Sequence, residues 1–147
     1  MHFRTITETD EIWEDVRAYA QACSWRAGAS LAASMADHSF EDWERVAVAL
    51  DDERICAFCT AAKTDCIPGL SYTPYIGYVF VDEAYRGNRL SERLIQFAAD
   101  YLKSVGFQEM YLISDHVGLY EKYGFSVIDR QMAPWGTEEK IYRKAII

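Results

Sequence analysis

The sequence predicts an α/β fold with one mixed central β-sheet flanked by helices, and three observations carry this prediction. Short apolar or alternating runs typical of strands occur at 45–50, 54–62, 76–82 and 109–114. Helical spacing of apolar residues separates these runs, most clearly after Gly87. The run at 76–82, this helix and the run at 109–114 form a strand–helix–strand unit, which is right-handed and parallel in folded proteins.

The remaining elements follow from the same patterns. Residues 2–7 alternate as a short strand, and Thr9 is expected to cap a helix whose first turn holds acidic residues. The pair 45–50 and 54–62 reads as a hairpin, because Asp51 and Asp52 supply turn material between the two runs. We further expect helices at about 28–36 and 117–123, a long helix from Gly87 to Gly106, and strands at about 125–131 and 138–145.

Length and charge exclude several classes of protein. A chain of 147 residues corresponds to a single domain, 1–147. The net charge of −8 argues against nucleic acid as a partner, because binding to a phosphate backbone needs clustered cations. The sequence shows no apolar stretch of membrane-spanning length and no apolar signal region at its start, so we expect no membrane association and a cytoplasmic location.

The four cysteines indicate neither a disulfide framework nor a metal site. Cys56 and Cys59 form a CxxC, but they lie in a predicted strand, where side chains three residues apart point to opposite faces. No second CxxC or His pair completes a tetrahedral set of ligands. We expect plain buried thiols and no metal.

One segment carries a candidate site. The strand at 76–82 runs into an Arg86-Gly87 turn, where the long helix begins. A helix N-terminus presents unpaired backbone N–H groups and a partial positive charge, and Arg86 and Arg89 add cations beside it. This is a natural seat for an anion, although an Arg-Gly turn also opens many helices that bind nothing.

Two motifs in this region resemble a known family. YVFVDEAYRGNRLSERLI, followed about 30 residues later by LYEKYGF, is similar to the GCN5-related N-acetyltransferase (GNAT) superfamily. The resemblance implies an acetyl-CoA enzyme in which the strand backbone at Val79, Phe80 and Val81 meets the pantetheine arm. It also implies that Tyr120 donates a proton to the CoA thiolate as general acid, although on local features alone Tyr120 reads as a core aromatic. The loop expected to wrap the pyrophosphate comprises Arg86, Gly87, Asn88, Arg89, Leu90 and Ser91.

The sequence departs from the family pattern at two points. The usual loop places glycine where this chain has Arg89 and glycine or alanine where it has Ser91, so Arg89 either assists a phosphate or obstructs the seat. The strand before the loop also lacks an acidic residue that could serve as general base. The open alternatives are a water relay held by Tyr75 or Tyr78, a direct role for His116, and a direct role for Asp82 or Glu83.

The reading favoured by the resemblance is an acyltransferase that moves an acetyl group to a primary amine of a small molecule by direct attack in a ternary complex. The alternatives are a catalytically degenerate CoA-binding or sensing domain and an acetyltransferase of a peptide or protein amine. The identity of the amine and the oligomeric state stay open, a homodimer being common in this fold. The expected walls of the acceptor site are Trp25, Arg26, Tyr72, Tyr75 and Trp135, with Asp37, Glu41 and Asp65 available to hold a cation.

Overall fold

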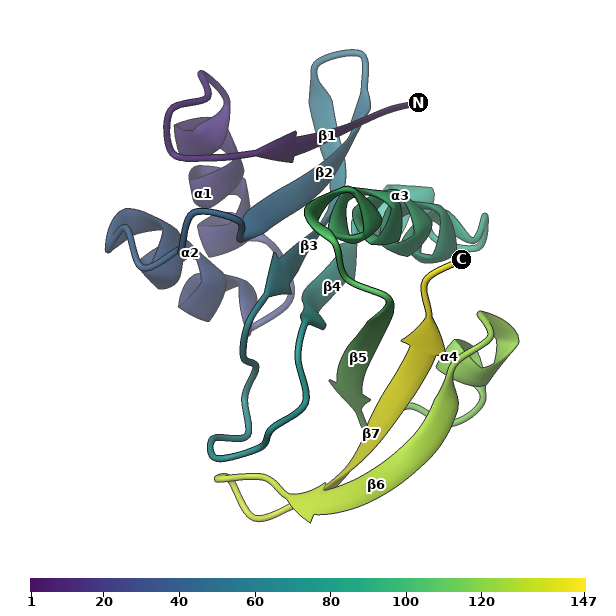
Figure 1. Ribbon diagram of the computed structural model, residues 1–147. Helices are drawn as coiled ribbons and strands as arrows, with labels where there is room; N and C mark the ends of the chain where they lie inside the picture. The colour runs from purple at the N-terminus through teal and green to yellow at the C-terminus, as the bar shows by residue number, and fades with distance from the viewer.

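The computed structural model describes all 147 residues and confirms the predicted α/β class. Its seven strands form one mixed sheet in the order β1-β2-β3-β4-β5-β7-β6 (Figure 1). The order of elements along the chain is also the predicted one. The elements are β1 (His2–Ile6), α1 (Trp13–Ala22), α2 (Gly28–Ala36), β2 (Arg45–Asp51), β3 (Arg54–Ala62), β4 (Tyr75–Val81), a 3-10 turn η1 (Glu83–Tyr85), α3 (Leu90–Val105), β5 (Glu109–Ser114), α4 (Leu119–Lys122), β6 (Ser126–Met132) and β7 (Glu138–Ala145).

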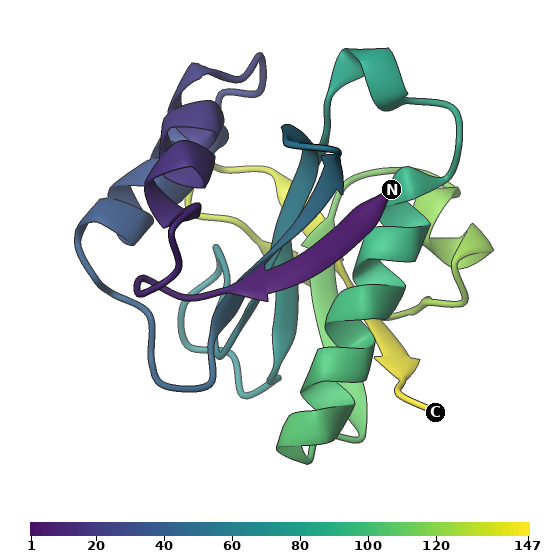
Figure 2. The same ribbon diagram turned by 90° about the horizontal axis from the view of Figure 1, so that it is seen from above.

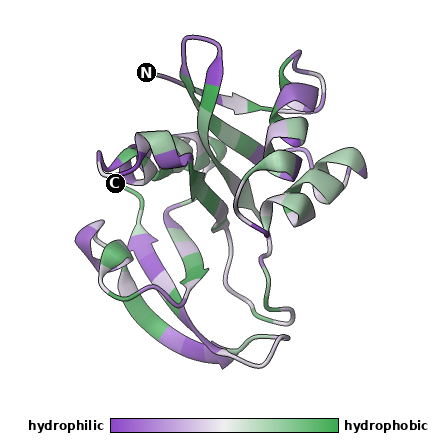
Figure 3. Cartoon of the chain, turned by 180° about the vertical axis from the view of Figure 1, so that it is seen from behind, coloured by the Kyte–Doolittle hydropathy of each residue, from purple (hydrophilic) through white to green (hydrophobic).

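The helices form two layers on opposite faces of the sheet. Viewed from above, α1 and α2 lie on one side and α3 lies on the other (Figure 2). Each layer has its own core: Leu31 and Met35 of α2 pack with Phe58 of β3, whereas Leu94 and Leu102 of α3 pack against the other face. Hydropathy follows this division, since the central strands are apolar and the tip of the β2–β3 hairpin is hydrophilic (Figure 3). No helix is both long enough and apolar enough to cross a membrane.

The predicted N-terminus of the first helix is wrong. The helix begins at Trp13, and Thr9 belongs to a preceding turn. In that turn the Asp10 carboxylate accepts a hydrogen bond from the backbone N–H of Thr7 at 2.7 Å, and the Asp10 N–H donates to the Thr7 carbonyl at 3.0 Å. The Trp13 N–H bonds to the Asp10 carbonyl at 3.1 Å, and no side chain caps the helix.

The expected burial of the CxxC thiols is confirmed, but the expected placement on opposite faces is wrong. Cys56 and Cys59 are both 0% exposed and belong to the same core cluster. Ala49 pairs with Ala57 while Leu50 pairs with Ile55, so a bulge at Cys56 shifts the alternation of β3.

The sheet opens between β4 and β5, and this opening positions the site. The two strands are parallel, as predicted, but only Tyr75 and Tyr111 are paired in register. Beyond this point β4 bends, because its register against β3 shifts between Phe58 and Thr60. Tyr78 at the bulge has a φ of 49°, a left-handed conformation that a bulky side chain adopts only under constraint.

Candidate functional site

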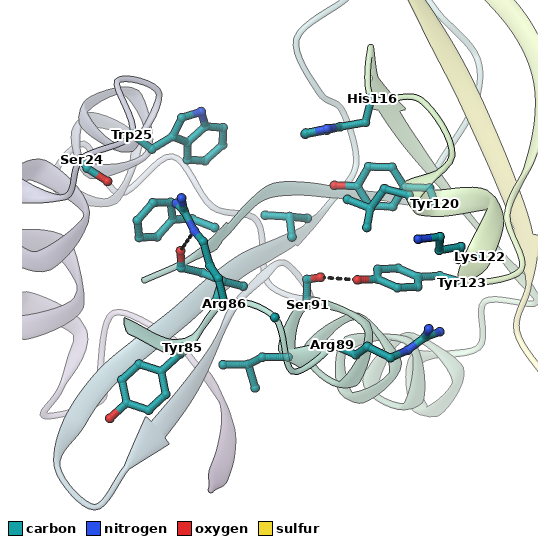
Figure 4. Close-up of a pocket in the computed structure, with 16 residues that line it drawn as sticks. Ser24, Trp25, Tyr85, Arg86, Arg89, Ser91, His116, Tyr120, Lys122 and Tyr123 are labelled. Atoms are coloured by element: carbon teal, nitrogen blue, oxygen red, sulfur yellow. Dashed lines mark hydrogen bonds between the residues drawn. The ribbon is translucent and has the colours of Figure 1, made fainter. Parts of the chain in front are cut away.

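A cavity of about 730 Å³ lies where β4, the start of α3 and α4 meet, and we call it the helix-start cavity. It gathers nearly all the residues that the family resemblance assigns to acetyl-CoA binding or to proton donation (Figure 4). The exception is Asn88, which does not line it. The lining consists of Ser24, Trp25, Val79, Phe80, Val81, Tyr85, Arg86, Gly87, Arg89, Leu90, Ser91, His116, Leu119, Tyr120, Lys122 and Tyr123.

The N-terminus of α3 presents backbone donors to this cavity. The first hydrogen bond of the helix runs from the Arg93 N–H to the Arg89 carbonyl at 3.2 Å, and no side chain caps the end. The N–H groups of Leu90 and Ser91 precede that bond, so they are free to meet an anion. Ser91 is fixed by a 2.7 Å hydrogen bond between its hydroxyl and that of Tyr123.

Arg89 adopts the backbone conformation of the glycine it replaces. Its φ and ψ are 54° and 32°, in the left-handed region that glycine adopts without steric cost. Its guanidinium is held by the Glu92 carboxylate at 2.7 and 2.9 Å and lies 5.4 Å from the centre of the Tyr123 ring. The side chain is therefore folded back along α3 (Figure 4), and the start of the helix is not covered by it.

Arg86 lies along the opened strand. Its Nε donates to the carbonyl of Val81 at 2.9 Å, and its guanidinium stacks 5.6 Å from the centre of the Phe80 ring. The edge of β4 that the opening leaves unpaired therefore carries a cation at its loop end (Figure 4). Val79, at the bulge, has no such side-chain partner on its backbone.

The Tyr120 hydroxyl points into the helix-start cavity from α4 (Figure 4). The side chain is 5% exposed and packs edge-on against His116, Tyr123 and Phe125. Burial raises the pKa of this phenol well above its usual value, so the hydroxyl stays protonated even in alkaline solution. The core-aromatic and functional readings of Tyr120 are thus compatible, because its ring is core while its hydroxyl faces the cavity.

A second cavity of about 520 Å³ continues through the sheet opening, and we call it the carboxylate cavity. It shares Trp25, Val79, His116 and Tyr120 with the helix-start cavity, so the two meet at these four side chains. Its other lining residues are Ala27, Ser30, Asp65, Cys66, Ile76, Gly77, Tyr78, Leu112, Ile113, Ser114, Asp115, Trp135 and Glu139.

The carboxylate cavity is electrostatically negative. Asp65, Asp115 and Glu139 line it, and no Lys or Arg does. Burial raises the pKa of Asp65 from 3.8 to about 7, although the nearby backbone N–H of Cys66 offsets part of the rise. Glu139 is 6% exposed and accepts a hydrogen bond from the Thr137 hydroxyl at 3.1 Å. Such a site favours a cationic ligand.

The candidates for a general base differ in position. Asp82 and Glu83 line neither cavity. The Ala84 backbone N–H and the Tyr19 hydroxyl both donate to Asp82, which lowers the pKa of its carboxyl. Glu83 accepts from the Ser24 hydroxyl. His116, in contrast, lines both cavities at their junction.

The tyrosines considered for a water relay also separate. Tyr78 lines the carboxylate cavity, and its hydroxyl lies 2.8 Å from that of Ser30. Tyr75 is 2% exposed and its hydroxyl has no hydrogen-bond partner. Tyr75 lines neither cavity, and neither does Tyr72, which was expected as a wall of the acceptor site and instead donates to Asp129 at 2.8 Å.

The expected walls of the acceptor site are found only in part. Trp25, Trp135 and Asp65 line the carboxylate cavity, whereas Arg26, Tyr72, Tyr75, Asp37 and Glu41 do not. Ser24, Lys122, Glu139 and Asp115 were missed as lining residues. A signal existed for Lys122 alone, which lies inside the LYEKYGF motif; the others reach the site through tertiary contacts that leave no local pattern.

Comparisons with known proteins agree with this geometry. The model of the Acetyltransferase (GNAT) family matches residues 9–125. No sequence of a curated protein matches the chain. Among solved structures, aminoglycoside 6'-acetyltransferase type Ii is 19% identical with a TM-score of 0.77, covering 100% of this chain and 98% of the other.

Two further structures are similar. Aminoglycoside 6'-N-acetyltransferase from Enterococcus faecium is 17% identical with a TM-score of 0.74, covering 100% of this chain and 98% of that one. The GNAT family N-acetyltransferase YhbS from Escherichia coli, solved in complex with CoA, is 21% identical with a TM-score of 0.70, covering 97% and 80%. At such identities these structures show the shared fold. The family match over most of the sequence shows more: this chain belongs to the GNAT acetyltransferase family.

Proposed function

We propose that this protein transfers the acetyl group of acetyl-CoA to a primary amine of a small cationic molecule, by direct attack in a ternary complex. The observation that carries the proposal is the meeting of two unlike cavities at the opening between β4 and β5. One offers backbone donors and cations, and the other offers carboxylates without cations. A single domain spanning 1–147 would hold both substrates.

The helix-start cavity fits acetyl-CoA. The free N–H groups at the start of α3 would receive the pyrophosphate, with Arg86 and Lys122 as nearby cations. The β4 backbone from Val79 to Val81 would run beside the pantetheine arm, with the Arg86 guanidinium already bonded to the Val81 carbonyl at the loop end. Acetyl-CoA supplies the activated acetyl group, and two of the structural neighbours described above are named for transferring acetyl groups to aminoglycosides.

The carboxylate cavity fits an amine that carries positive charge. An ammonium would find Asp65, Asp115 and Glu139 as counterions, and Trp25 and Trp135 as aromatic faces for cation–π contact. Aminoglycosides are polycationic small molecules, so the names of the neighbours support the same chemical class. We therefore favour a small polyamine or amino sugar over a peptide amine.

Tyr120 would supply the proton for the leaving thiolate. Its hydroxyl faces the junction of the two cavities, and because burial raises its pKa above the ordinary value of 10 it carries its proton at neutral pH and well above it. As the bond between sulfur and the acetyl carbon breaks, the phenol would donate its proton to the sulfur. The surrounding rings hold the phenol in place, which restricts the geometry of the transfer.

The proposal is tested in two steps. Thermal melts are recorded with acetyl-CoA, CoA and ATP, since a ligand that binds only the folded state raises the Tm. We expect acetyl-CoA and CoA to raise it and ATP to have no comparable effect. Thiol release is then measured with a panel of polyamines, amino sugars and lysine peptides. Binding of acetyl-CoA without amine-stimulated thiol release would instead indicate a CoA-sensing domain, and stimulation by peptides alone would indicate a peptide acetyltransferase.

A further inference from the structure

Asp65 lies against β4 at the point where the sheet opens. A Cβ atom at Gly77 would come within 3.2 Å of Asp65 Oδ1 and 3.1 Å of Thr60 Oγ1, so the carboxylate lies close against the strand and a larger residue at position 77 would crowd it. Gly77 directly precedes the bulge at Tyr78, and Val79 lines both cavities. The Asp65 carboxylate comes from the loop between β3 and β4. It nevertheless lies beside Gly77, which is two positions before Val79 of the junction.

The three carboxylates of the cavity are not equivalent. Asp115 is exposed to solvent, and Glu139 already accepts a hydrogen bond from Thr137. Asp65 has no cationic partner and no side chain that donates to it. It also borders a smaller cavity of about 330 Å³ on its other side, which likewise has no Lys or Arg in its lining. No Lys or Arg lines either cavity beside this carboxylate, so an incoming ammonium would be its first cationic partner.

We propose that the Asp65 carboxylate accepts the proton that the acceptor ammonium must lose before its nitrogen attacks the thioester, an inference that rests on the proposed function. Ammonium and carboxylate become amine and carboxylic acid. The nitrogen then bonds to the acetyl carbon as the carbon–sulfur bond breaks, and the sulfur takes the Tyr120 proton. The new amide nitrogen loses its second proton to restore Tyr120 through solvent, and Asp65 releases its proton to solvent.

The surroundings of Asp65 set the pH range of this step. Burial raises the pKa of Asp65 to about 7, which suits a group that must accept a proton near neutral pH and release it afterwards. The other acidic residues that line the two cavities around it are Glu44, Asp115 and Glu139, and neither cavity is lined by Lys or Arg. The titratable residues lining these cavities are Glu44 before β2, Cys66 beside it, Tyr78 on β4, Asp115 and His116 after β5, Tyr120 on α4 and Glu139 on β7, while Tyr75 on β4 lies close enough for its pKa to respond to Asp65.

The test compares pH profiles of kcat/KM for the wild type and Asp65→Asn, using the amine that is most active in the thiol-release panel. For the wild type, kcat/KM should fall below about pH 7. For Asp65→Asn, kcat/KM at neutral pH should drop about 10²- to 10⁴-fold. Without the base, only amine that is already free in solution can react, and its fraction grows about tenfold per pH unit up to the pKa of the ammonium, about 10 for an alkyl amine. The difference in kcat/KM between the wild type and Asp65→Asn should therefore shrink about tenfold per pH unit over this range.

Two matched variants separate Asp65 from its neighbours. Glu139→Gln removes the same charge from the same cavity, and it should raise KM while the fall below pH 7 persists. His116→Gln should also retain that fall. If Asp65→Asn keeps the wild-type profile, or if His116→Gln alone abolishes the fall, Asp65 is not the base and the inference is overturned.

A second route covers the case in which Asp65→Asn does not fold. Gly77→Ala places a methyl group against the carboxylate, and it should lower kcat at neutral pH while acetyl-CoA still raises the Tm as in the wild type. Unchanged kcat in Gly77→Ala would contradict the inference. If acetyl-CoA fails to stabilise even the wild type, the proposed function is wrong. If the wild type acetylates amines and the Asp65 variants do so equally well, the proposed function stands and only the inference about Asp65 is wrong.

Discussion

The helix-start cavity and the carboxylate cavity meet at four side chains, yet they are built differently. The first is formed mainly by two local segments, the loop that opens α3 and the motif around α4. The second is assembled from β4, β5, β7, four loops and one residue each of α2 and α4, and its character depends on which carboxylates face inward. A site whose ligand contacts come from backbone groups tolerates changes of side chain. A site whose contacts come from side chains changes its specificity with each substitution. This explains how Arg89 can replace a glycine while the start of α3 stays open.

The largest effect should come from Tyr120→Phe, which removes one hydroxyl at the junction and keeps the ring. We expect kcat to fall about 10²-fold or more. Acetyl-CoA should raise the Tm of this variant as much as that of the wild type. The groups expected to bind acetyl-CoA lie at the start of α3 and along β4, whereas the Tyr120 hydroxyl acts only on the sulfur as it leaves. Tyr123→Phe, which loses only the contact to Ser91, is the matched control. Equal kcat values for Tyr120→Phe and the wild type would remove Tyr120 from the mechanism.

The second effect is on stability and concerns the carboxylate cavity. Between about pH 4 and 7 the folded chain holds a proton on Asp65 that the unfolded chain releases, because the folded pKa is the higher one. The free energy of unfolding should therefore decrease as pH rises through this range. Asp65→Asn should be more stable than the wild type at pH 8 by about 1–3 kcal/mol, after allowance for solvent screening, and equal to it below pH 4.

Asp82 provides the opposite control for this measurement. The Ala84 N–H and the Tyr19 hydroxyl lower the pKa of its carboxyl, so its ionised form stabilises the fold above its ordinary pKa of 3.8. Asp82→Asn should therefore destabilise at neutral pH, and the loss should disappear in acid. Urea unfolding at several pH values measures both variants. A stability of Asp65→Asn that does not depend on pH relative to the wild type would mean that Asp65 titrates normally.

A smaller effect tests whether the helix-start cavity is sensitive to nearby charge. Arg89→Ala leaves the Glu92 carboxylate without its partner at the start of α3, close to the expected pyrophosphate. The Kd for CoA should rise about three- to tenfold, since exposed charges interact only modestly in water. Arg89→Ala combined with Glu92→Gln should restore affinity. If the single variant binds CoA more tightly than the wild type, the Arg89 side chain obstructs the site.

The smallest effect should come from Arg89→Gly. A left-handed conformation costs a non-glycine residue about 1–2 kcal/mol, and the exposed pair with Glu92 returns only part of that. Glycine also has the more flexible unfolded state, which reduces the gain. The Tm should rise by about 2–4 °C per kcal/mol for a chain of this size. A lower Tm would show that the pair with Glu92 outweighs the backbone strain.

The two cavities also differ in how far the sequence predicts them. Hydrophobic periodicity places every strand and helix, because each element buries one face and repeats at its own period. The residues from Arg86 to Ser91 and Tyr120 can be named because they lie in two contiguous motifs that resemble the GNAT family. The two local errors, the cap at Thr9 and the alternation at Cys56, arise from hydrogen bonds that the residue pattern does not reveal. These are the turn closed by Asp10 and the shifted pairing of β3 with β2.

The carboxylate cavity could not be predicted in the same way. Asp65 is the one acidic residue of the loop between β3 and β4, but no local pattern distinguishes its role from that of Asp37 or Glu41. Its significance depends on Gly77, twelve positions away, and on the bulge that turns β4 at Tyr78. Glu139 enters from a strand near the other end of the chain. Such a site is defined by tertiary contacts, so only the folded structure brings its members together.

The central claim is that donor and acceptor occupy the two cavities at the same time. Initial rates measured while acetyl-CoA and the amine are varied together test this most directly. A ternary complex predicts double-reciprocal lines that intersect, with no thiol released before the amine is added. Parallel lines, with a burst of thiol from acetyl-CoA alone, would show an acetylated enzyme intermediate and contradict the account.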